Sequence, residues 1–456
     1  MMPPEPSTRS LQGEEEEYDS QEEIWGRLTD VHCHANDAFE GEDLARAAAE
    51  IGGLGTGQVC VMSSSLDSQW KTEQLRALQP HKVVPAFGLH PWFSATISIT
   101  NEEGGQRIVD RRDHYRRVLT KRHPPLVVVQ AKKSKLRHDD EVAHQKDDEA
   151  EELLLAWIDR HLHLLPDPTP LEHFLTDLRA RLVRSPGSMI GEVGLDKLFT
   201  FHIHPRSSPS AAGSPSGQSG MIIRSKYKVL IAHQLHILHA QMSLAIELGR
   251  PVSLHCVQAS TELLGLLEVL TDQWGPRFTG VPSTRNALHA SSEPHRKQPA
   301  SGSEHGGVNL CWHSPTVSPE LIQQILRKLP RTFYFSYSSH LAALHPPSSS
   351  SQPLPPPPSP SPSSQDEKKQ KNPPLYSSRA RRAIQATPID RLLLESDHGQ
   401  HPATIDRKLR DIFRLVLSLQ PSTPDQPNNA LHLAAQIEAN WHRFYSPALV
   451  HPSSPH

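Results

Sequence analysis

The segment "TDVHCHAND", residues 29–37, contains the first strand of the fold that this sequence predicts. Asp30, His32 and His34 occupy every second position in it. Residues two apart in a β-strand point to the same side, so these three side chains share one face if the segment is a strand. Two imidazoles on one face are close enough to hold one metal ion. A surface strand with unrelated histidines is the alternative, and the rest of the chain decides between the two.

Seven further short apolar segments alternate along the chain with segments of helical periodicity. The eight predicted strands lie at residues 27–34, 57–64, 82–90, 188–196, 251–256, 307–313, 332–338 and 390–397. The strongest helical pattern runs from Ile231 to Ile246 and stops at Gly249. Eight strands alternating with helices predict an α/β fold in which a parallel sheet closes into a (β/α)8 TIM barrel. A doubly wound open sheet is the alternative, but no GxGxxG motif at a strand–helix turn supports it.

The composition predicts a folded body that is interrupted by disordered insertions. Apolar residues make up only 36% of the 456 residues, whereas there are 42 prolines. We expect a disordered acidic tail over residues 1–24 and one barrel domain over residues 25–450. The low-complexity insertions are expected at about residues 124–152, 204–220, 280–306 and 346–374.

Charge and cysteine content narrow the function classes. A formal net charge of −3 provides no global attraction to nucleic acid or membrane, so a polyanionic substrate needs a local binding site. The four cysteines are widely separated, which argues against a disulfide framework and fits a reducing compartment. The acidic N-terminal segment lacks the apolar region of a signal peptide, and no apolar run reaches membrane-spanning length. We therefore expect a protein of the cytoplasm or the nucleus that does not bind membranes.

Metal-ligand side chains gather where a barrel of this type carries its functional residues, at the C-terminal ends of the strands. Alone, His255 would be read as a core histidine and Asp397 as a helix N-cap. Their joint placement with the other strand-end residues instead predicts a metal centre. The strand-end residues are His32, His34, His90, Glu192, Asp196, His255, His313, Glu395 and Asp397.

The number of these groups indicates more than one ion. Four histidines and two carboxylates exceed what a single tetrahedral ion needs. They suit two divalent ions about 3.5–4 Å apart that share a bridging carboxylate, an arrangement used for hydrolytic displacement. Imidazole ligands favour zinc, while the carboxylates also accommodate magnesium or manganese.

The order of the motifs resembles that of the TatD-like metal-dependent deoxyribonucleases, which are amidohydrolase-type barrels. The matching segments are "DVHCH", "GLHP", "IGEVGLD", "PVSLHC", the strand-six histidine and "LLLESD". The resemblance covers about residues 28–445 apart from the insertions. It implies a hydrolase that cleaves DNA phosphodiester bonds with a water activated by two metal ions.

The resemblance also implies a role for each site residue. Glu192 would bridge the two ions, and Asp397 would orient the attacking water and take its proton, so these two are the implied catalytic residues. His90 would bind the substrate near the scissile phosphate. The implied metal ligands are His32, His34, Glu192, His255, His313 and Asp397.

The substrate-facing loops depart from the family pattern and leave two alternatives open. Lys197 follows "GLD" where the family often has an aromatic residue, and His398 and Gly399 replace the usual Ala-Pro. One alternative is a related metal-dependent hydrolase acting on another ester or an amide. The second is a barrel that works mainly as a protein partner. The Ser/Pro-rich insertions resemble those of fungal family members, some of which are described as interacting with a subunit of the cell-cycle ubiquitin-ligase machinery, and the proline-rich insertion is a candidate docking segment.

Overall fold

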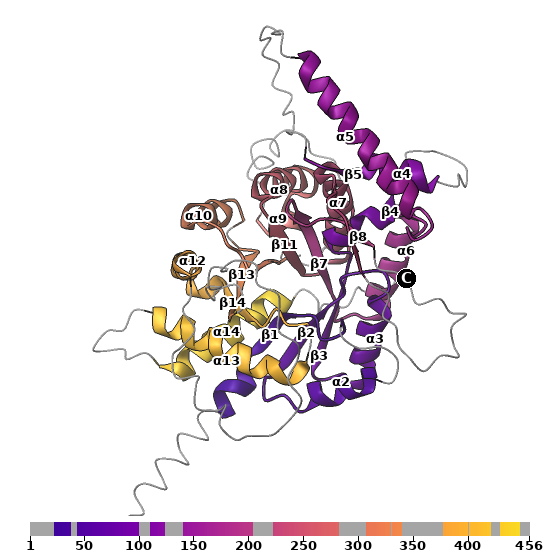
Figure 1. Cartoon of the computed structure of the whole chain (residues 1–456). Coiled ribbons are helices and arrows are strands. Elements are labelled where there is room, and N and C mark those ends of the chain that lie inside the picture. The colour runs from indigo at the N-terminus through magenta and orange to yellow at the C-terminus, as the bar shows by residue number, and fades with distance from the viewer. Residues whose placement is uncertain are drawn as a thin grey trace, which may run out of the picture.

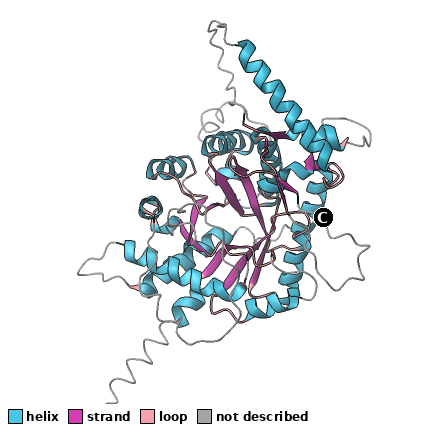
Figure 2. Ribbon diagram, in the orientation of Figure 1, coloured by secondary structure: helices cyan, strands magenta, loops and turns pink. Residues whose placement is uncertain are grey.

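Eight parallel strands form the centre of the molecule, and all eight were predicted (Figures 1 and 2). The computed structural model describes residues 22–37, 43–99, 110–123, 140–203, 222–281, 307–329, 331–339, 377–399, 401–420 and 429–446. The strands of the central sheet are β1 Thr29–Cys33, β2 Gln58–Met62, β3 Val83–Phe87, β7 Met189–Asp196, β11 Val252–Val257, β12 Leu310–His313, β13 Phe333–Ser338 and β14 Leu392–Glu395.

The sheet closes on itself. Its strands follow the order β1-β2-β3-β7-β11-β12-β13-β14, and every neighbouring pair is parallel. The ends of the first and last strands then meet, because the amide of Asp397 donates to the carbonyl of His32 at 3.0 Å. The amide of His34 donates in turn to the carbonyl of His398 at 2.8 Å. The predicted (β/α)8 barrel is therefore confirmed.

Helices surround this sheet (Figure 1). They are α2 Asp43–Gly52, α3 Gln69–Leu78, α6 Leu171–Arg184, α7 Ile231–Leu248, α8 Ser260–Trp274, α9 Pro276–Thr279, α10 Pro319–Lys328, α12 Ser378–Ala386, α13 Ile405–Leu419 and α14 Ala430–Tyr445. Helix α7 ends where predicted, since Gly249 adopts the left-handed conformation with φ 64°. Helices α10 and α12 had not been predicted.

Helix α14 covers the N-terminal end of the barrel. Its Trp441 and Phe444 belong to the buried cluster that also contains Val31 and Met62 of the strands. Asn309, just before β12, donates its side-chain amide to the carbonyl of Phe444 at 2.8 Å. The opposite end, where the strands terminate, is the end left for a functional site.

A separate group of short elements, here called the cap, follows the C-terminal ends of β3 and β7. Its elements are η1 Pro91–Thr96, β4 Ile97–Ser98, α4 Arg111–Val118, β5 Leu119–Thr120, α5 Asp140–His161, β6 Thr169–Pro170, β8 His202–Ile203, β9 Ile223–Arg224 and β10 Lys228–Val229. The sequence predicts a helix near residues 111–122, which is α4, but not the rest of the group. The cap has its own buried cluster, which includes Tyr115, Ile158, Phe201 and Tyr227. Because it follows two strand ends, it adjoins the mouth of the barrel.

Most of the predicted tail and insertions lie outside the described residues. Two described segments differ from the expectation. Residues 22–27 are helical, and Ile24 is buried within the predicted 1–24 tail. Residues 140–152 of the predicted 124–152 insertion belong to helix α5, so that part has regular structure. Among the described helices, none is both long and apolar enough to cross a membrane.

Candidate metal centre

The carboxylate of Glu192 lies at the centre of a cluster of imidazoles at the barrel mouth. Glu192 is on β7 and is only 2% exposed. Its Oε1 lies 2.7 Å from Nδ1 of His255 and 2.7 Å from Nε2 of His313. Nε2 of His90 lies 3.2 Å from the same oxygen. Three strand ends therefore direct a ring nitrogen at one carboxylate oxygen.

The other oxygen of Glu192 faces the two histidines of β1. Its Oε2 lies 3.2 Å from Nε2 of His34 and 3.6 Å from Nε2 of His32. These two ring nitrogens are 3.3 Å apart. His32 and His34 therefore approach one point, as the sequence predicts.

Close approach of β7 and β11 is what brings Glu192 and His255 together. Gly194 lies opposite His255 in the parallel register of these strands. A Cβ at Gly194 would lie 1.9 Å from the carbonyl oxygen of His255, which no side chain permits. The second glycine of "GEVGLD" is therefore required by packing of the site, not by the conformation of a turn.

Serine hydroxyls contact the ring nitrogens of His32 and His34 that point away from Glu192, here called the remote nitrogens. Nδ1 of His32 lies 2.8 Å from Oγ of Ser253. Nδ1 of His34 lies 3.1 Å from Oγ of Ser64. With the remote nitrogen engaged, the nitrogen facing Glu192 keeps its orientation, as in histidines that bind metals. Neither serine was predicted, although Ser253 lies two residues before His255 on the same strand.

Carboxylates face the remote nitrogens of the other two histidines, although Nδ1 of His313 has no hydrogen-bond partner among the described residues. Oδ2 of Asp196 lies 3.4 Å from Nε2 of His255. Oε1 of Glu395 lies 3.7 Å from Nδ1 of His313. Glu395 is completely buried and accepts hydrogen bonds from Ser314 and Ser336. Both carboxylates had been noted at strand ends but had not been assigned to the site.

The charge balance of the cluster fits cations. Burial by itself raises the pKa of Glu192, yet the surrounding imidazoles hold that pKa well below its usual value. Burial alone lowers the pKa of His34, but the hydrogen bond and charge of Glu192 raise it to about 9. A cation between these ring nitrogens and the ionised carboxylate would be attracted by both. The groups within reach of one ion are His32, His34 and Glu192; His90, Glu192 and His255; and His32, His313 and Glu395.

His90 differs from the other histidines. Burial is the main reason that its pKa falls to about 4, in spite of the nearby Glu192 carboxylate. Its Nδ1 accepts a hydrogen bond from the amide of Trp92 at 3.2 Å, so the neutral ring carries its proton on Nε2. His90 thus presents a donor to the cluster, whereas the metal-ligand role requires a free nitrogen.

Asp397 lies at the edge of the cluster. Its Oδ1 is 4.0 Å from Nε2 of both His32 and His34, and its side chain is 19% exposed. The residue has a left-handed backbone with φ 49°, and β14 already ends at Glu395. Alternation along a strand would place Leu393, Glu395 and Asp397 on one face, but the strand ends before Asp397.

Asp30 does not reach the imidazoles. Strand β1 has an irregular register between Asp30 and Cys33. The Asp30 carboxylate instead accepts hydrogen bonds from the amide of Ser396 at 2.9 Å and from the amide of His32 at 3.2 Å. The predicted common face for Asp30, His32 and His34 thus holds only for the two histidines, because a bulge breaks the two-residue repeat.

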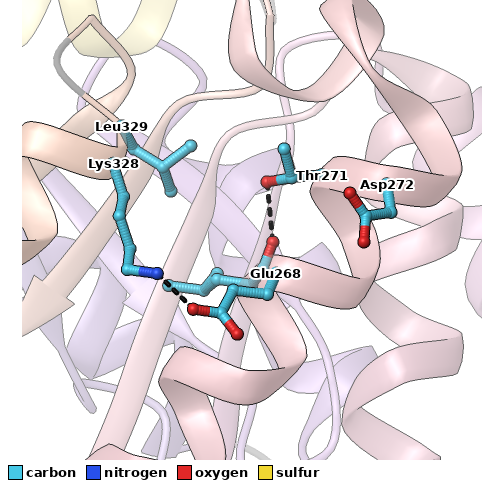
Figure 3. A pocket seen from close by; sticks show the side chains of 6 residues that line it. Glu268, Thr271, Asp272, Lys328 and Leu329 are labelled. Atoms are coloured by element: carbon cyan, nitrogen blue, oxygen red, sulfur yellow. Dashed lines mark hydrogen bonds and ion pairs between the residues drawn. The ribbon is translucent and has the colours of Figure 1, made fainter.

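The cleft shown in Figure 3 is a different place. It lies between α8 and α10 and is lined by residues including Glu268, Thr271 and Lys328, of which Lys328 pairs with Glu268. These residues are in the later turns of their helices, which lie towards the N-terminal end of the strands in a barrel. None of its lining residues belongs to the imidazole cluster.

Comparison with known proteins agrees with this geometry. The family described as TatD related DNase matches residues 29–345. The chain belongs to the TatD family. Of the candidate ligands, this match leaves out Glu395 and Asp397, which lie beyond residue 345 at and after the end of β14. A hydrolase of the TatD kind, with candidate metal-ligand groups at its barrel mouth, is therefore established as the class of this protein.

Two curated fungal relatives match most of the chain. The protein named Cut9-interacting protein scn1, from Schizosaccharomyces pombe, is 30% identical over 313 residues, which are 68% of this chain and 78% of that protein. A protein named as an uncharacterized deoxyribonuclease, from Saccharomyces cerevisiae, is 24% identical over 314 residues, or 67% of this chain and 71% of that one. Among solved structures, the TatD homologue YjjV of Escherichia coli aligns over 93% of this chain and 99% of its own, with 15% identity and a TM-score of 0.43.

Proposed function

We propose that this TatD-family protein is a deoxyribonuclease that hydrolyses DNA phosphodiester bonds with two divalent cations. The observation that carries the proposal is the position of Glu192. One of its oxygens faces His255 and His313, and the other faces His32 and His34. A carboxylate between two separate sets of ring nitrogens has the geometry expected of a bridging ligand.

Each proposed ion has its own set of side chains. His32, His34 and Asp397 would hold the first ion, and His255 and His313 would hold the second, with Glu192 shared. Mixed imidazole and carboxylate ligation suits zinc, manganese or magnesium. When bound, such ions supply positive charge that polarises phosphoryl oxygens and makes water more acidic.

Two residues would act on the reactants directly. Asp397 is the partly exposed carboxylate at the rim of the cluster, so it is proposed to orient the attacking water and accept its proton. His90 is neutral and carries its proton on Nε2, which faces the cluster, so it is proposed to donate to an oxygen of the scissile phosphate.

The proposal is tested by adding magnesium, manganese or zinc to the purified metal-free chain and following hydrolysis of single- and double-stranded DNA with free 3′ ends. Simple carboxylic esters and amides, offered in the same buffers, test the alternative hydrolase class. Metal-dependent release of nucleotides, absent from Glu192→Gln, supports the proposal. A protein that holds both ions and cleaves no phosphodiester contradicts it.

A second candidate function comes from the name of the fission yeast relative. We propose that this chain also binds a protein of the Cut9 kind, independently of hydrolysis. The wild type and a His32→Ala, His34→Ala variant should capture the purified partner equally well. A variant lacking residues 346–374 tests whether the proline-rich segment carries the interaction. Absence of binding by the wild type would dismiss this candidate.

A further inference from the structure

A stacked pair of aromatic rings stands beside the candidate metal centre. Trp92 follows His90 in η1, and its ring lies parallel to that of Phe199, with centroids 4.2 Å apart and an interplanar angle of 11°. Trp92 is nevertheless 39% exposed. Its Nε1 donates to Oδ2 of Asp196 at 2.8 Å, and that carboxylate also faces His255. The orientation of an exposed indole is thus fixed at the barrel mouth.

The strands of the cap next to this pair are strongly basic. Residues 119–123, 197–203 and 222–229 contain six lysines and arginines and no aspartate or glutamate. Thr120 of β5 lies opposite Lys228 of β10 in one antiparallel ribbon, and His202 of β8 lies opposite Arg224 of β9 in a second. Nζ of Lys228 donates to the carbonyl of Lys197 at 2.6 Å. The basic ribbon is thereby joined to the chain immediately after Asp196.

The lysines and arginines of these strands differ from the arginines of α4 in their ion pairing. On α4, Arg112 pairs with Asp159 and Arg116 pairs with Glu151, both acids of α5. Those pairs neutralise two of the arginines of α4. Within the described parts of the chain, by contrast, no carboxylate forms an ion pair with four exposed residues of the ribbon and its neighbour β9: Lys121, Arg122, Arg224 and Lys226.

We propose that Trp92, Phe199 and the basic strands of the cap form the binding surface for a single DNA strand whose phosphodiester enters the centre. The proposal rests on the deoxyribonuclease function above. Aromatic rings beside a row of exposed cations are the two parts of sites that bind single strands, since rings stack on bases and cations neutralise phosphates. The bases of a duplex have their faces covered, so the rings select an unpaired end. With a net charge of −3, the chain attracts DNA only through such a local surface.

Binding is measured without turnover. The metal-free protein in a chelator is titrated into a fluorescent single-stranded oligonucleotide of about 12 nucleotides, and anisotropy is followed over a series of salt concentrations. The test variant carries Arg122→Glu and Arg224→Glu. The matched control is Arg327→Glu, which changes an exposed arginine of α10 at the far end of the barrel. We expect the double variant to bind at least about tenfold more weakly and to lose about two units of the salt slope.

The contribution of the aromatic rings to binding is measured with two substitutions of Trp92. Trp92→Phe and Trp92→Leu both lose the hydrogen bond to Asp196, but only phenylalanine keeps a ring for stacking. For an oligonucleotide with bases, Trp92→Leu should bind about 5- to 100-fold more weakly than the wild type, and Trp92→Phe should retain most of the affinity. With abasic nucleotides at the 3′ end, the two variants should bind alike.

The inference is overturned if the double variant binds the oligonucleotide as well as Arg327→Glu does. It is also overturned if Trp92→Phe and Trp92→Leu have equal effects on both oligonucleotides. Absence of binding by the wild type at low salt overturns it as well. Hydrolysis of bis(p-nitrophenyl) phosphate, a small diester that needs no extended surface, tests the centre separately. Cleavage of this ester without oligonucleotide binding refutes the inference and leaves the hydrolase standing. Binding through the cap without cleavage of any diester refutes the deoxyribonuclease and leaves the inference standing.

Discussion

Asp30 and Ser396 are joined by hydrogen bonds although 366 positions separate them in the chain. The Asp30 carboxylate accepts from the Ser396 amide at 2.9 Å and from the Ser396 hydroxyl at 2.5 Å. Asp30 is on the first strand of the barrel, and Ser396 follows the last one. Both are completely buried. The contact therefore joins the first and last strands of the barrel beside the candidate metal ligands His32 and Asp397.

Loss of this contact should be costly for the fold. Asp30→Ala leaves the buried donors of Ser396 and His32 without an acceptor, and we expect unfolding free energy to fall by about 3–5 kcal/mol. Ser396→Ala removes only one hydroxyl and should cost about 1 kcal/mol. Urea denaturation of the metal-free protein measures both. Equal stability of the two variants would show that other contacts hold the first and last strands of the barrel together.

Two divalent ions per chain are expected, because ring nitrogens approach Glu192 from two sides. Reconstitution followed by elemental analysis should give about two equivalents for the wild type. Removing both β1 ligands with His32→Ala and His34→Ala should eliminate one ion preferentially. Replacing His255 and His313 should eliminate the other. A wild type that retains no stoichiometric metal after reconstitution rules out the centre.

Glu192→Gln should reduce hydrolysis more than replacement of His90 does. The glutamine lacks the negative charge that holds two cations in proximity, so metal content should fall together with activity. His90→Gln preserves a side-chain donor and leaves the carboxylate intact, so its main effect should be a raised KM. Metal analysis and steady-state kinetics on the same preparations compare the two. Equal losses with both ions retained in each variant would contradict this ranking.

Asp397→Asn tests the proposed base. The amide keeps the size of the side chain and can still offer a carbonyl oxygen, but it cannot accept a proton at neutral pH. We expect the fold and at least one ion to remain while kcat falls by roughly 10²–10⁴-fold, the usual range for general acid–base catalysis. Rates and metal occupancy are determined together. Wild-type rates in this variant would mean that another group takes the proton.

The sequence was sufficient for the barrel because each strand is a short apolar segment that ends in a polar residue. It also predicted which side chains converge, since parallel strands bring their C-terminal ends to one place. Cys33 illustrates the strength of this reasoning. The two-residue repeat places it opposite His32 and His34, and it packs in the layer between barrel and helices.

Features that depend on contacts distant in sequence could not be predicted. The bulge in β1 redirects Asp30 to Ser396, and no local pattern indicates a partner so far along the chain. Ser64, just after β2, and Ser253, in β11, are ordinary serines in the sequence, and only the fold places them behind imidazoles. The strands of the cap were missed because they are only two residues long, too short for any periodicity to register.

The position of α14 has a consequence for synthesis of the protein. A ribosome makes the barrel strands first, from β1 to β14, and makes the helix that covers their N-terminal end last. Until residues 430–445 emerge, the interior around Val31 and Met62 lacks Trp441 and Phe444 and stays open to water. Nascent chains of this length are prone to aggregate through such surfaces. Chaperone engagement should accordingly persist until α14 has left the ribosome.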